Sequence, residues 1–147
     1  MKKQTLLKSA LLLLPALAVG LATTGDSVMV FDTLTGTLEY FSYFDVLPYG
    51  TYQTITPLAA LLCVLVGVLA AIFLAAKKEK LLKAVMVLSM VTSIVAVAPI
   101  LMSGDVKIVP NVALPLFMLL EYVAAYCLGK KPETEKYQEK LKARRLK

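Results

Sequence analysis

Glu121 is the residue best placed to do chemistry, because it puts one carboxylate inside an otherwise uncharged apolar run, Leu114–Leu128. An ionisable group at membrane depth is costly and commonly belongs to a proton or cation pathway. Lys8 and Lys83 lie near the ends of other apolar runs and can reach toward Glu121 from the same side. The three residues form a candidate intramembrane ionisable site.

Two interpretations of this candidate site stay open. Glu121 can titrate during transport, or it can anchor the structure, held by a lysine or kept protonated by burial. We favour the anchor, because the other apolar runs offer no His, Asn, Gln or second acid as a relay.

Apolar runs of this kind define the elements that must position Glu121. The chain has 147 residues, is 59% hydrophobic and has a mean hydropathy of +0.74. Crossing a hydrocarbon core of about 30 Å takes roughly 20 apolar residues. We therefore expect four transmembrane helices, at about 6–22, 57–76, 81–102 and 109–128. The first run also resembles a secretory signal peptide, since Gly20 and Ala22 suit a cleavage site, but we favour a retained helix.

The distribution of charge predicts how the chain is threaded. Of the 16 Lys and Arg residues, all except Lys107 fall on one side of a four-pass topology, at Lys2, Lys3, Lys8, Lys77–Lys83 and Lys130–Lys147. Excess Lys and Arg mark the cytoplasmic side. Both termini are therefore expected in the cytoplasm, and the Lys-rich chain with short loops suggests a bacterial plasma membrane. The net charge of +6 reports topology and does not indicate nucleic-acid binding.

The segment between the first two helices carries the only strand signals. Two β-branched and aromatic runs flank Thr35-Gly36, which predicts a hairpin over about 27–44 with Gly36 at a positive φ. Aromatic residues cluster here and are expected to form an external aromatic surface, either a membrane-interface belt or a recognition surface. They are Phe31, Tyr40, Phe41, Tyr43, Phe44, Tyr49 and Tyr52.

The sequence as a whole predicts an all-α membrane protein. Residues 1–128 form a four-transmembrane-helix bundle with a small extracellular β-hairpin cap, and residues 129–147 form a basic cytoplasmic tail helix. Within the second helix, small residues recur every fourth position and are expected to form one helix-packing ridge. They are Ala59, Cys63, Gly67, Ala71 and Ala75.

Several classes of function lack their residues in this sequence. There is no His, no phosphate-binding Gly-rich loop, no nucleophile elbow and no paired-cysteine motif. The layout is similar in outline to lipoprotein signal peptidases, but the Asn- and Gly-rich motifs around that family's aspartates are missing. We expect a non-enzymatic protein without cofactor or metal.

The expected function is that of a small accessory or scaffold subunit. Its aromatic cap and small-residue helix faces would contact the lipid bilayer, another membrane protein or a second copy of itself. The alternative is a small oligomeric transporter or channel with Glu121 as its titratable site.

Overall fold

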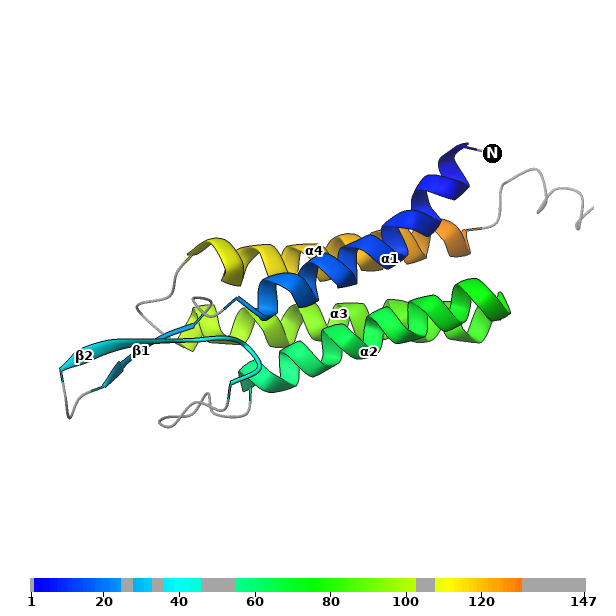
Figure 1. Ribbon diagram of the computed structural model, residues 1–147. Helices are drawn as coiled ribbons and strands as arrows, with labels where there is room; N and C mark the ends of the chain where they lie inside the picture. Colours follow the sequence, from blue (N-terminus) through cyan, green and yellow to red (C-terminus); the bar gives the residue numbers. More distant parts are fainter. Residues whose placement is uncertain (1, 25–27, 33–35, 46–54, 103–107, 131–147) are drawn as a thin grey trace, which may run out of the picture.

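Four long helices dominate the computed structural model of this chain (Figure 1). It describes residues 2–24, 28–32, 36–45, 55–102 and 108–130. The elements are α1 (Lys2–Ala22), β1 (Val28–Asp32), β2 (Thr37–Phe41), α2 (Ile55–Ala76), α3 (Glu79–Met102) and α4 (Ile108–Gly129). All four helices are long and apolar enough to cross a membrane, which confirms the predicted helices and suits a membrane-embedded protein.

The helices form an up-down-up-down bundle in which each helix packs against the next one in sequence and α4 closes the ring against α1. The start of α1, the α2–α3 connection and the end of α4 lie at one end, and the hairpin projects from the other (Figure 1). We call these ends the basic end and the hairpin end, since Lys8, Lys80, Lys83 and Lys130 all belong to the first.

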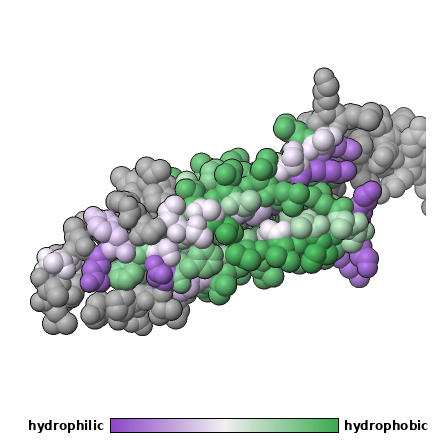
Figure 2. Space-filling model, viewed as in Figure 1, coloured by the Kyte–Doolittle hydropathy of each residue, from purple (hydrophilic) through white to green (hydrophobic). Residues whose placement is uncertain are grey.

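The hydropathy of the surface follows this arrangement. In the view of Figure 2 the middle of the bundle is covered by apolar residues, and hydrophilic residues gather at its two ends. A hydrophobic band between polar ends is what a bilayer requires of the protein surface that it contacts. The predicted tail helix falls on residues outside the described part of the chain, which ends at Lys130.

Each helix contributes one narrow buried seam to the core. Buried positions alternate at spacings of three and four residues, the repeat that keeps one face of a helix against its neighbours. In none of the four spans is more than 33% of the residues buried, so most of each helix is free to face lipid. The seams comprise Leu11, Pro15, Ala18 and Ala22; Thr56, Ala59, Cys63, Val66 and Ala70; Leu82, Val85, Ser89, Thr92 and Ala96; and Leu114, Met118, Glu121 and Ala125.

The small-residue ridge of α2 does not pack as one surface inside the bundle. Ala59 and Cys63 are buried, and a Cβ on Gly67 would lie 3.4 Å from the Pro15 Cβ of α1, but Ala71 and Ala75 are exposed. The reason is geometric. With 3.6 residues per turn, a step of four residues advances about 40° around the helix, so the ridge winds through about 160° from its first to its last member. The buried seam instead passes through Val66 and Ala70.

The two strands pair antiparallel at the hairpin end, with Val28 opposite Phe41 and Asp32 opposite Thr37. Gly36, which precedes β2, has a φ of +69°. This left-handed conformation favours glycine, because a Cβ would crowd the backbone there.

A two-residue connection joins α2 to α3 and makes them antiparallel neighbours. Lys77 takes a left-handed φ of 53°, and its N–H donates to the Phe73 carbonyl at 2.7 Å. That bond is the αL motif that closes the carboxyl end of a helix, here with lysine where glycine is usual. Glu79 then opens α3, where a negative charge complements the helix dipole.

Candidate functional site

Glu121 lies in the core of the bundle. The α4 seam places it one turn after Met118 and one turn before Ala125, and its side chain has 0% exposure. Neither carboxyl oxygen has a hydrogen-bond partner. A buried polar group without a partner is unusual in a folded protein and costs about 1–3 kcal/mol.

Hydroxyl groups of α3 lie near the depth of Glu121 but donate their hydrogen bonds to other acceptors. Ser93 Oγ donates to the Pro115 carbonyl at 2.9 Å, which ties α3 to α4. Counting from this contact, Glu121 lies about 9 Å along α4 and Ser89 about 6 Å along α3 in the same direction. Ser89 is fully buried, and its hydroxyl donates to the Val85 carbonyl of its own helix at 2.7 Å. The oxygen of Ser89 therefore remains an acceptor at nearly the depth of Glu121.

Lys8 and Lys83 are exposed, and the structure does not bring either of them to Glu121. Lys83 follows the buried Leu82 and precedes the buried Val85 by two positions, so it lies beside the seam and not on it. A long basic side chain near a membrane edge gains more by extending to polar surroundings than by entering the core. Of the three residues grouped from the sequence, Glu121 alone occupies the interior.

The aromatic residues of the outer segment also separate into distinct environments. Tyr43 is fully buried, Phe41 and Phe44 are half-buried and pack against the core, and Tyr40 is 46% exposed. The side chains of the three others, Phe31, Tyr49 and Tyr52, fall outside the described part of the structure.

Tyr43 fastens the hairpin to the bundle. Its backbone N–H donates to the Ala22 carbonyl at the end of α1, at 3.0 Å. Burial, with a smaller contribution from the Cys63 thiol of α2, raises the pKa of Tyr43 well above its ordinary value. The following turn is closed by the Ser42 N–H, which donates to Asp45 Oδ2 at 2.6 Å. We call Phe41–Phe44 the hairpin anchor.

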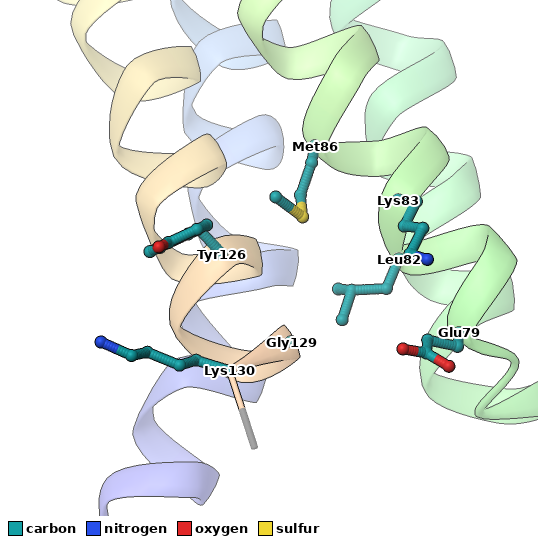
Figure 3. Close-up of a pocket in the computed structure, with 7 residues that line it drawn as sticks. All are labelled: Glu79, Leu82, Lys83, Met86, Tyr126, Gly129 and Lys130. Carbon is teal, nitrogen blue, oxygen red and sulfur yellow. The ribbon is translucent and has the colours of Figure 1, made fainter. Parts of the chain in front are cut away.

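A groove between α3 and α4 at the basic end was not expected from the sequence. Figure 3 shows Leu82 and Met86 projecting from α3 into the gap beside α4, whereas the side chains of Tyr126 and Lys130 extend from α4 away from α3. Gly129 lies against Leu82, since a Cβ there would be 3.4 Å from Leu82 Cδ2. The signal in the sequence is weak: a glycine at a helix end and tyrosines four residues apart, which are stacked here at a centroid distance of 6.4 Å.

Within the described ranges, no three His, Cys, Asp or Glu residues are grouped so that they could hold a metal ion. Cys63 is buried and Cys127 exposed, and both are free thiols. No protein-family model, curated protein or solved structure matches this chain.

Proposed function

We propose that this chain is a non-enzymatic, multi-pass membrane protein that serves as an accessory or scaffold subunit, with its hairpin as the contact to another membrane protein. The observation that carries the proposal is the hairpin anchor. Tyr43 is buried to 0% exposure at the end of the bundle, whereas Glu39 and Tyr40 of β2 are exposed. A two-stranded hairpin is marginal by itself in water, so one that is fastened in this way suits presentation to a partner.

We place the hairpin outside the cell and both ends of the chain in the cytoplasm. Lysines gather at the basic end, where the exposed Lys77 and Lys78 form the α2–α3 connection and Lys80 follows in the first turn of α3. The positive-inside preference assigns that end to the cytoplasm. Pro15 of α1 packs against Gly67 of α2, which supports a first helix that is retained in the mature protein. The membrane that we propose is a bacterial plasma membrane.

The test begins with gentle purification of the tagged protein from its native membrane and measurement of the mass and composition of the complex. We expect a stoichiometric second protein. A photo-crosslinking residue at Tyr40 should then join to that protein, whereas the same residue at Leu65, exposed on the apolar face of α2, should not. A pure homo-oligomer, or equal crosslinking from both positions, would contradict the proposal.

One observation favours a second candidate, a small oligomeric transporter or channel. Both oxygens of the buried Glu121 lack a partner, and a proton or small cation is the simplest ligand that would satisfy them. Under the accessory proposal, Glu121→Gln leaves the complex intact and changes no flux. Loss of a proton or cation flux in proteoliposomes, with the yield of folded protein unchanged, would favour the transporter instead.

A further inference from the structure

We propose that the groove between α3 and α4 binds one anionic glycerophospholipid, with its phosphate at Lys83 and one acyl chain along α3. This inference does not depend on the accessory role. The groove is continuous, has the length of one bilayer leaflet and carries charged residues at its mouth.

The groove consists of two adjoining cavities. The first, of about 190 Å³, lies at the basic end and is lined by charged and apolar residues of α3 and α4. The second, of about 470 Å³, continues toward the middle of the bundle and shares Lys83 and Met86 with the first. Its remaining lining residues are Val87, Met90, Val91, Ile94 and Tyr122.

The length of this groove fits one leaflet of a bilayer. From Lys83 to Ile94 the lining follows α3 through eleven residues, or about 17 Å of helix. Half of a hydrocarbon core of about 30 Å is about 15 Å. An acyl chain whose headgroup lies beside Lys83 would therefore occupy the groove to its end. Methionine side chains such as Met86 and Met90 are flexible enough to fit around such a chain.

The mouth of the groove selects the headgroup. Lys83 lies on the α3 side, Lys130 follows α4 with its side chain directed away from α3, and Glu79 is the one acid among the lining residues (Figure 3). These three side chains carry a net charge of +1, which one phosphodiester would neutralise. The exposed Lys77, Lys78 and Lys80 make the surrounding field more positive, and each basic residue near the surface attracts anionic lipid. Glu79 can accept a hydrogen bond from a hydroxyl of the headgroup.

The experiment uses the full chain in detergent micelles, with lipid occupancy measured by native mass spectrometry. Phosphatidylglycerol is titrated against phosphatidylethanolamine with the same acyl chains. We expect the first phosphatidylglycerol molecule to bind more tightly than the first phosphatidylethanolamine molecule. Lys83→Gln should weaken that binding about tenfold, because it removes a charge-assisted hydrogen bond to the phosphate. Lys83→Arg should retain most of it.

Lys80→Gln is the matched control for charge, because Lys80 is exposed on the same helix but lines neither cavity. Ile94→Trp and Ile72→Trp form the matched pair for the acyl chain. Ile94 lines the far part of the groove, whereas Ile72 is exposed on α2. We expect Ile94→Trp to weaken binding and Lys80→Gln and Ile72→Trp to change it less than twofold. Helicity and elution volume show that each variant is folded.

Three outcomes would overturn the proposal. If Lys80→Gln and Lys83→Gln weakened phosphatidylglycerol binding equally, the lipid would be attracted by the positive charge of the whole surface and not bound at a specific site. Equal affinity for the two lipids would remove the role assigned to the lysines. Unchanged binding in Ile94→Trp would place the acyl chain outside the groove.

Discussion

Glu121 shows at the scale of a residue how a buried group can oppose stability. Its two oxygens lack hydrogen-bond partners in a core otherwise made of apolar and small side chains. Met118, one turn away on the same seam, shows that this face accepts an unbranched side chain of similar size. A residue that destabilises its own surroundings is characteristic of a site kept for function, which favours the second candidate, the transporter or channel, and stability and flux can be measured separately.

We expect Glu121→Met to raise the free energy of unfolding by about 1–2 kcal/mol, because it removes an unsatisfied polar group and retains the volume. Unfolding in mixed micelles measures this change. Glu121→Gln is the control, since it retains a buried polar group and should gain little. A loss of stability in Glu121→Met would mean that the carboxyl group has a partner, such as a bound ion.

Tyr43 gives a prediction on pH. Its pKa is raised in the folded protein, so folding favours the neutral phenol. The stability it contributes is complete below the ordinary tyrosine pKa of about 10 and is lost as the pH rises above that value. Between pH 9 and pH 11 the wild type should lose about 1 kcal/mol more than Tyr43→Phe, which cannot ionise. If the two proteins lost the same free energy of unfolding between pH 9 and pH 11, the phenol of Tyr43 would not be buried.

At the scale of the element, the sequence predicted the existence of the helices better than their beginnings. Hydropathy detects the apolar part of a span, and α1 begins at Lys2, before the expected start near Leu6, because lysines are also good helix formers. Only the first part of the ridge on α2 packs inside the bundle, because a four-residue repeat keeps to one face of a helix only over two or three turns. The burial of Tyr43 could not be foreseen, since nothing local distinguishes it from the exposed Tyr40.

The α2–α3 connection provides the first prediction at this scale. Lys77 holds a left-handed φ of 53°, which costs a residue with a Cβ about 1 kcal/mol. Lys77→Gly should raise the free energy of unfolding by about that amount. Lys77→Ala removes the same charge but retains the Cβ, so it should give no gain. Equal effects of the two substitutions would assign the change to charge and not to the backbone.

Gly67 provides the second prediction at the scale of the element. A Cβ on Gly67 would lie 3.4 Å from Pro15 Cβ, so a leucine side chain must push α1 and α2 apart. Gly67→Leu should destabilise the bundle by about 1–3 kcal/mol. Gly20→Leu is the control on α1, because a Cβ there meets nothing within 4 Å. Similar stability of the two variants, measured by thermal unfolding in detergent, would show that the helices are not in close contact here.

At the scale of the whole molecule, the separation of the basic end from the hairpin end predicts orientation. Asp45 and Lys80 are both exposed and belong to opposite ends. In a protein with both native cysteines replaced by alanine, Asp45→Cys should react with an impermeant thiol reagent added to intact cells. Lys80→Cys should react only after the membrane is opened. The reverse pattern would invert the topology and place the lysines outside.

The narrow seams have a consequence for how such a protein evolves. Since at most a third of the residues in any span are buried, selection for packing acts on few positions, and many of these require only a small side chain. Lipid-facing positions such as Leu61 and Ile72 accept any apolar residue. Two descendants of one ancestor can therefore retain this bundle and agree at few positions. Their common origin would be preserved in the alternating three- and four-residue spacing of small residues.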